Sequence, residues 1–220
     1  MGAIDTEKIL KELDRLWAST GKSSEEEGAA VLRACSLNLL VVTSGEVGEL
    51  SNSLSDLTRQ HPSRTIILRL SPGAEATLDA RANVICWMPF GKRQQICSEQ
   101  IVVESSVGGV AGIPPLVSGL LASDLPVILW YEDAERAGSM RLEKLDRLAN
   151  KIIVDGRDCA DPEDAVRILE LCRDRAGQAA DLGWTAITPW RELIAHAYSS
   201  EEALAQLESV RAVELDYCEE

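Results

Sequence analysis

Runs of apolar residues alternate with amphipathic stretches along the chain, and this alternation predicts strands and helices in turn. The residues from Leu37 to Thr43 are apolar or β-branched with one exception, which is typical of a strand that is buried on both faces. This strand could begin as early as Arg33. Comparable runs predict further strands over residues 65–70, 83–88, 96–105, 126–131, 151–155 and 211–217.

Between these runs, apolar residues recur at spacings of three and four, as they do on one face of a helix. A capping box in Thr43-Ser44-Gly45-Glu46 would start one of these helices. Residues 19–27 are polar and predict a mobile link, although Glu25 to Glu27 would also suit the start of a helix that leads into residues 29–35. The expected helices cover residues 5–18, 47–57, 114–121, 139–149, 161–173 and 188–198.

Strands that alternate with helical segments predict an α/β fold. We expect three layers, with a mostly parallel or mixed central sheet and helices on both of its faces. We expect an N-terminal helix and polar link over residues 1–30 and the α/β core over residues 31–178. Residues 179–220 are expected to add a helix with a Trp-Arg pair and a C-terminal strand.

Charge narrows the classes of partner. The chain has 220 residues, of which 45% are apolar, and its 36 acidic and 22 basic residues give a formal net charge of −14. Such a surface repels phosphate backbones and anionic lipids, so we expect neither nucleic acid nor membrane as a partner. The sequence has no long apolar run and no basic leader followed by an apolar stretch, and we therefore expect a cytoplasmic protein.

The cysteine pattern does not favour a metal site. The six cysteines contain no C-x-x-C pair, and the two histidines, His61 and His196, are far from any cysteine pair, so a zinc site is not expected. Several cysteines stand in apolar runs, where a reduced thiol behaves as a small hydrophobic side chain. We expect reduced thiols at Cys35, Cys86, Cys97, Cys159, Cys172 and Cys218.

The sequence shows no catalytic set. Glu132, Asp133 and Asp155 follow predicted strands and could converge on Mg²⁺, although acids in such places are more often caps or solvated loop residues. The first strand has no glycine fingerprint for phosphate, Ser118 lacks the G-x-S-x-G context, and two histidines do not complete a Ser-His-acid set. We therefore predict no catalytic residue, no metal and no cofactor.

Two further segments favour structural roles. The glycine-rich residues 107–112 are interpreted as a flexible connector, because the prolines that follow cannot donate hydrogen bonds to an anion. In His61-Pro62-Ser63-Arg64, Pro62 is expected to stop a helix, Ser63 to make a turn, and Arg64 to cap a carbonyl or pair with an acid.

Large aromatic residues divide between core and surface candidates. Trp130 lies within a predicted core strand, whereas Trp190 stands at a helix start with Arg191 beside it, which is typical of an interface.

Five segments, taken in order, form a further pattern: His61-Pro62-Ser63-Arg64; Ile96-Cys97-Ser98-Glu99-Gln100-Ile101; Ser123-Asp124-Leu125-Pro126-Val127-Ile128-Leu129-Trp130-Tyr131; Leu145-Asp146-Arg147-Leu148-Ala149 with Ile152-Ile153-Val154-Asp155; and Asp181-Leu182-Gly183-Trp184-Thr185-Ala186-Ile187-Thr188-Pro189-Trp190-Arg191. With this order and spacing, the chain resembles the glucose-6-phosphate dehydrogenase assembly protein family, OpcA.

The resemblance implies a non-catalytic assembly factor or allosteric effector that binds glucose-6-phosphate dehydrogenase in the oxidative pentose phosphate pathway. In photosynthetic bacteria it also implies control through thioredoxin. The family motifs fall on candidate partner-binding residues, namely His61, Pro62, Ser63, Arg64, Cys97, Glu99, Gln100, Asp124, Trp130, Trp184, Trp190 and Arg191.

Two features depart from the family pattern. Ala186 stands where members usually carry an Arg after the Trp-Thr pair, so any contact of that Arg is lost. Members also usually continue into a second β-rich region, so the resemblance implies a short version of the family with a truncated C-terminal part. A second hypothesis is an α/β domain that binds or acts on a sugar phosphate, through Ser63, Arg64 and the acidic strand ends.

Overall fold

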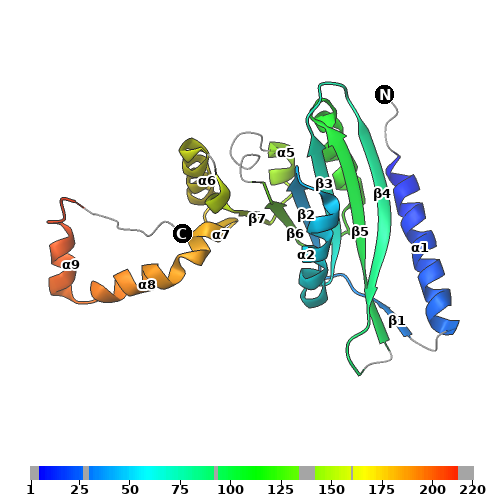
Figure 1. Ribbon diagram of the computed structural model, residues 1–220, viewed down its shortest axis with the longest axis horizontal. Coiled ribbons are helices and arrows are strands. Elements are labelled where there is room, and N and C mark those ends of the chain that lie inside the picture. The colour runs from blue at the N-terminus through cyan, green and yellow to red at the C-terminus, as the bar shows by residue number, and fades with distance from the viewer. Residues whose placement is uncertain (1–4, 27–29, 92–93, 134–141, 160, 213–220) are drawn as a thin grey trace. The chain divides into compact units, whose positions relative to one another are not determined.

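The computed structural model describes residues 5–26, 30–91, 94–133, 142–159 and 161–212. The chain divides into two compact units, Met1–Leu182 and Gly183–Glu220. The first unit is built on an eight-stranded sheet with helices packed on it (Figure 1). The predicted α/β fold with a mostly parallel sheet is therefore confirmed.

The strands follow the order β1-β5-β3-β2-β6-β7-β8, and β4 pairs with β5 outside this path. All neighbouring strands run parallel except β4 and β5, which form an antiparallel pair. The strand bounds are β1 Ala30–Arg33, β2 Leu37–Thr43, β3 Ser63–Ser71, β4 Leu78–Trp87, β5 Gln94–Ser106, β6 Val127–Tyr131, β7 Lys151–Val154 and β8 Ala179–Asp181.

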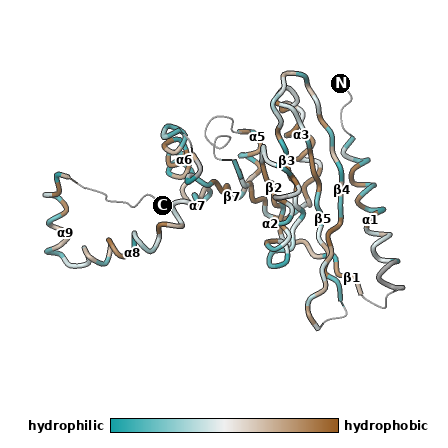
Figure 2. Tube along the Cα trace, viewed as in Figure 1, coloured by the Kyte–Doolittle hydropathy of each residue, from teal (hydrophilic) through white to brown (hydrophobic). Residues whose placement is uncertain are grey.

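Side chains of the central strand β2 point alternately to the two faces of the sheet, and both faces are covered. Leu40 and Val42 belong to one buried cluster, and Leu39 and Val41 belong to another. Because a strand alternates its side chains, an apolar run on such a strand is buried throughout. Figure 2 shows the hydrophobic colour along the strands of this sheet.

Helices cover each face with apolar side chains. On one face, α1 (Thr6–Glu26), α3 (Ile113–Leu120), α5 (Glu143–Asp146) and α6 (Pro162–Asp174) contribute to the larger cluster. On the other face, α2 (Val47–Gln60) contributes Leu50 and Leu54. The sheet with a helical layer on each side gives the expected three layers.

The amino-terminal region differs from two expectations. Residues 19–26 continue α1 rather than form a mobile link, and the hydroxyl groups of Ser19 and Thr20 donate hydrogen bonds to the Leu16 carbonyl inside the helix. The helix considered for residues 29–35 is also wrong, because Ala30–Arg33 form β1 beside β5. Sheet pairing with a distant strand thus decides the structure of a short, ambiguous segment.

Two local predictions, a helix capping box and a flexible connector, are wrong. Glu46 stands at the start of α2 without a side-chain cap, and its carboxylate binds Arg69 instead. The glycine-rich residues form a 3₁₀ helix, η1 (Val107–Gly112), rather than a flexible connector. A Cβ at Gly108 would lie 2.2 Å from the Ala74 carbonyl oxygen, so close packing of two loops accounts for this glycine.

The helix start at residue 161 is confirmed in detail, because the Asp161 side chain accepts a hydrogen bond from the Glu163 amide and Pro162 occupies the first turn. The helix expected over residues 139–149 is a single turn in its described part, α5, and residues 139–141 lie outside the described residues.

The second unit contains most of α7 (Leu182–Ala186), together with α8 (Thr188–Ala197) and α9 (Glu201–Leu207). Helix α9 is not among the helices expected from the sequence. Of the strand expected over residues 211–217, residues 211 and 212 are not in a strand, and the remainder lies outside the described residues. Among the described helices, none combines the length and apolar composition that a bilayer span requires.

A core substitution tests the assignment of the buried layer. Leu68 of β3 has no exposed surface, so L68A should lower the free energy of unfolding by about 2–5 kcal/mol. Leu57 of α2 is 40% exposed, and L57A should change it by less than about 0.5 kcal/mol. Urea unfolding curves of both variants measure the difference. Equal effects of the two substitutions would contradict the buried position of Leu68.

Candidate functional site

Two of the motif residues meet inside the first unit. Arg64 near the start of β3 lies opposite Glu99 of β5 in the parallel register. The Arg64 Nε donates a hydrogen bond to Glu99 Oε2 over 2.5 Å, and the Glu99 side chain is only 2% exposed. A carboxylate removed from water to this extent requires a cationic partner.

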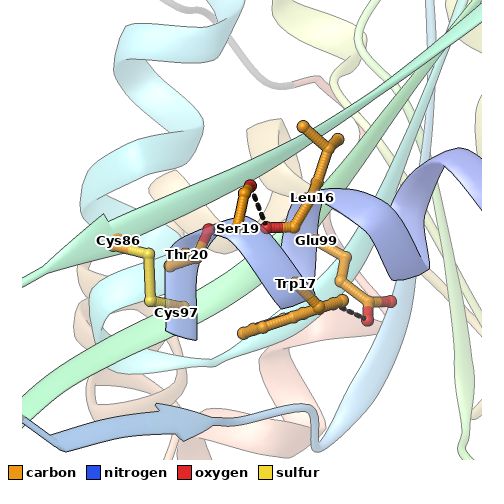
Figure 3. The surroundings of a disulfide bond; sticks show 7 residues. All are labelled: Leu16, Trp17, Ser19, Thr20, Cys86, Cys97 and Glu99. Carbon is orange, nitrogen blue, oxygen red and sulfur yellow. Dashed lines mark hydrogen bonds between the residues drawn. A yellow bond between two sulfur atoms is a disulfide. The ribbon is translucent and has the colours of Figure 1, made fainter. Parts of the chain in front are cut away.

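Glu99 has two more partners, from α1 and β1. The Trp17 Nε1 donates a hydrogen bond of 2.8 Å to Glu99 Oε1, as Figure 3 shows, and Arg33 forms an ion pair with the same oxygen. The Arg33 guanidinium lies 5.1 Å from the centroid of the Trp17 ring. This group, which we call the Glu99 cluster (Trp17, Arg33, Arg64 and Glu99), joins α1, β1, β3 and β5.

Arg64 also holds the loop between α3 and β6, because its Nη1 donates a hydrogen bond of 2.9 Å to the Leu120 carbonyl. The Asn38 side chain accepts from the Ala122 amide at 2.7 Å and donates to the Ala122 carbonyl at 3.0 Å. Asp124 takes the turn of this loop with a positive φ of 62°, which aspartate tolerates better than most residues. Arg64 thus makes both of the contacts expected from the sequence, because it pairs with the acid Glu99 and caps the carbonyl of Leu120.

The other motif residues of the first unit are dispersed. His61 is exposed at the end of α2, and Pro62 follows it partly buried. Ser63 is the first residue of β3 rather than a turn residue, with its hydroxyl 3.0 Å from that of Thr65. Gln100 donates a hydrogen bond of 3.3 Å to Ser51 of α2.

Trp130 is partly buried and packs against the smaller of the two hydrophobic clusters, which α2 covers. This agrees with its predicted place in the core.

The cysteine prediction is wrong for one pair. Cys86 of β4 and Cys97 of β5 are direct neighbours across the antiparallel pair, with Cα atoms 4.1 Å apart, and form a disulfide (Figure 3). Cys97 and Glu99 point to the same face of β5, because side chains alternate along a strand. The disulfide therefore lies on the face that α1 covers, near the Glu99 cluster.

Within the described residues, Cys35, Cys159 and Cys172 form no disulfide, and Cys218 lies outside the described residues. Burial is the main cause that raises the pKa of the Cys35 thiol, and burial likewise raises the pKa of Cys172. A raised pKa lowers the fraction of reactive thiolate at neutral pH. The thiols of Cys35 and Cys172 are therefore deprotonated to a smaller extent at neutral pH than a fully exposed cysteine would be.

The acids at the strand ends do not converge. Glu132 accepts a hydrogen bond from the Thr43 hydroxyl, and Asp133 accepts one from that of Ser44. Asp155 pairs with Arg157, whose hydrogen bond lowers the pKa of the Asp155 carboxyl. Within the described residues, no three His, Cys, Asp or Glu side chains come together in a way that could hold a metal ion.

The remaining motif residues lie in the second unit and point outward. Trp190 is 68% exposed, and Trp184 is about half exposed. The Arg191 guanidinium lies 4.0 Å from the centroid of the Trp184 ring, which is a close cation–π contact. The motif residues thus separate into a buried group around Glu99 and an exposed aromatic group on α7 and α8.

Sequence reasoning missed the roles of Trp17, Arg33 and Cys86. The sequence placed Trp17 only within the expected helix over residues 5–18, and it left open whether Arg33 belongs to a helix over residues 29–35 or begins a strand. The facing positions of Cys86 and Cys97 require knowledge of how β4 and β5 pair, although two predicted strands in succession were a signal for such a hairpin.

Comparison with known proteins gives a consistent result. The family model described as the glucose-6-phosphate dehydrogenase subunit N-terminal domain matches residues 54–171, which is more than half of the chain. A curated relative from Synechocystis, described as a putative OxPP cycle protein OpcA, is 27% identical over 154 residues. This match covers 69% of the chain and 32% of the relative, so the chain spans about a third of the relative's length.

Removal of the buried carboxylate should be far more costly than removal of an exposed one on the same strand. E99Q leaves Arg64 buried without its counter-charge and should lower the free energy of unfolding by about 3–5 kcal/mol. Glu104 also lies between two arginines, Arg69 and Arg81, but its side chain is 37% exposed. E104Q should therefore cost less than about 1 kcal/mol. Chemical denaturation measures both, and similar costs would refute the central role of Glu99.

The disulfide should stabilise the oxidised chain. It joins residues 11 positions apart, and a loop of that size corresponds to about 3 kcal/mol of lost unfolded-state entropy. The double substitution C86S/C97A should therefore lower the urea midpoint of the oxidised protein, and a dithiol reductant should lower the midpoint of the wild type. The reductant should not change the urea midpoint of the variant. A lower midpoint of the reduced variant would show that the effect of the reductant comes from another disulfide.

Proposed function

The chain belongs to the family of the glucose-6-phosphate dehydrogenase subunit N-terminal domain, to which the assembly protein OpcA belongs, and from this membership we propose that it binds glucose-6-phosphate dehydrogenase. In this proposal the chain is a non-catalytic protein of the cytoplasm, and it promotes the assembly or activity of the enzyme in the oxidative pentose phosphate pathway. The observation that carries the proposal is the family match over residues 54–171.

Several features of the described residues support a binding role. Two charged motif residues of the first unit, Arg64 and Glu99, are buried and neutralise each other, and the strand-end acids have hydroxyl or arginine partners. The exposed motif residues of the second unit are two tryptophans and an arginine, the residue types that most often dominate protein interfaces. The formal charge of −14 would steer the chain toward a basic surface.

The sugar-phosphate hypothesis loses its main support. It depended on Ser63 and Arg64, but Arg64 is buried between Glu99 and the Leu120 carbonyl. Binding of a phosphate to Arg64 would therefore require the Glu99 ion pair to break.

Addition of the purified chain to the cognate glucose-6-phosphate dehydrogenase tests the proposal. We expect a larger complex in light scattering coupled to size exclusion and a change in dehydrogenase activity that saturates as the chain is titrated. The effect should weaken at high salt, because charge steers the encounter.

An unrelated acidic protein of similar size serves as the control for nonspecific effects of charge. The proposal fails if the chain changes neither the mass nor the activity of the enzyme across the titration. It also fails if the acidic control has the same effect as the chain.

A further inference from the structure

Helix α8 carries a continuous apolar face that the described residues of its own unit leave exposed. Trp190, Leu193, Ile194 and Ala197 stand at positions i, i+3, i+4 and i+7, which places them on one side of the helix. Leu193 is 61% exposed and Ile194 is 58% exposed, and α8 has no buried residue. Contiguous apolar surface of this kind marks binding sites on proteins more often than it occurs by chance.

The helix also lacks the packing that would stabilise it. It has 10 residues, and isolated helices of that length are marginal in water because nucleation is costly. Helices in proteins owe most of their stability to burial of an apolar face. A partner that covers Trp190, Leu193 and Ile194 would therefore stabilise α8 as well as gain contact area.

A polar border orients this face. Arg191 and His196 flank the apolar side at 100° per residue, and Arg191 contacts the Trp184 ring, whereas Glu192 lies on the opposite side of the helix. Contact with Trp184 restricts the Arg191 side chain, and this lowers the entropy lost when an interface forms. Tryptophan with arginine is also a frequent pair at the centre of interfaces.

Charge indicates which surface could cover the face. Residues 183–220 contain only Arg191 and Arg211 as basic residues, against eight acidic ones: Glu192, Glu201, Glu202, Glu208, Glu214, Asp216, Glu219 and Glu220. A complementary partner would present an apolar groove bordered by Lys and Arg. A second copy of this chain, with a net charge of −14, does not offer that complement.

We propose that α8 is a docking helix that inserts Trp190, Leu193 and Ile194 into an apolar groove with a basic rim on a partner protein. This inference rests on the proposed function, since the partner is taken to be the dehydrogenase that the chain binds. The mode is the insertion of an amphipathic helix into a groove, in which apolar anchors give affinity and the charged border gives orientation.

The test compares two leucines of similar exposure. L193A removes an anchor from the proposed face, while L169A removes a leucine that is 51% exposed on α6 in the other unit. Both substitutions keep a good helix former at an exposed position, so neither should unfold the chain. A third variant, W190A, removes the largest anchor.

Affinity for the purified cognate dehydrogenase is measured by titration calorimetry for the wild type and the three variants. L193A should weaken binding on the order of tenfold, and W190A on the order of tenfold to a hundredfold. L169A should bind as the wild type does. Hydrogen exchange should show rapidly exchanging α8 amides in the free chain that become protected in the complex.

The outcomes separate the two proposals. Failure of the wild type to bind the enzyme overturns the proposed function. If the wild type binds and L193A and W190A bind with the same affinity, the docking helix alone is overturned. An equal loss of affinity in L169A and L193A overturns it as well. Slow exchange of the α8 amides in the free chain would show that the chain itself already covers the face, and this would overturn the docking helix. A wild-type dimer that L193A dissociates would assign the face to a second copy of the chain instead.

A membrane provides the remaining alternative. Vesicles of phosphatidylcholine with an anionic lipid should not bind the chain, because its net negative charge is repelled by them. Vesicle binding that L193A abolishes would overturn the assignment to a protein groove.

Discussion

The buried carboxylate of Glu99 on β5 needs partners that neutralise its charge, and these partners come from several elements of the fold. Transfer of Glu99 from water costs several kcal/mol unless its oxygens receive charged hydrogen bonds in good geometry. Arg64 supplies one from the neighbouring strand and the Trp17 indole another from α1, while Arg33 of β1 adds an ion pair. Arg64 then holds the α3–β6 loop through Leu120. Loss of the Glu99 charge would therefore affect four elements and a loop together.

The parts of the fold that sequence predicts are those that local pattern determines. The apolar run of β2 and the Asp161-Pro162 start of α6 contain their own signals, namely burial on both faces and a cap followed by proline. The Arg64–Glu99 pair is different, because it joins residues 35 positions apart and exists only when β3 lies beside β5. The Cys86–Cys97 disulfide likewise depends on strand register, which composition does not reveal.

The motif residues carry two distinct kinds of information. Arg64, Glu99 and Asp124 serve the fold, since they form a buried ion pair and a strained turn. Trp184, Trp190 and Arg191 contribute little to the described packing and leave large aromatic surface in water. The sequence indicates both groups, because a family motif does not distinguish buried aromatic or charged residues from exposed ones. Burial then separates the motif residues that form contacts inside the fold from those that are exposed.

This separation bears on how an acidic chain could bind tightly. Exposed carboxylates have favourable hydration that an interface must remove, so the acidic residues of the chain would contribute more to steering and orientation than to affinity. Apolar side chains incur no such cost, and each Å² that leaves water contributes about 25 cal/mol. In the proposed docking mode, binding energy is therefore expected to come from Trp190, Leu193 and Ile194, while the net negative charge of the chain favours partners of the opposite charge. The surface that these side chains expose in the free chain is then the surface that the partner would cover.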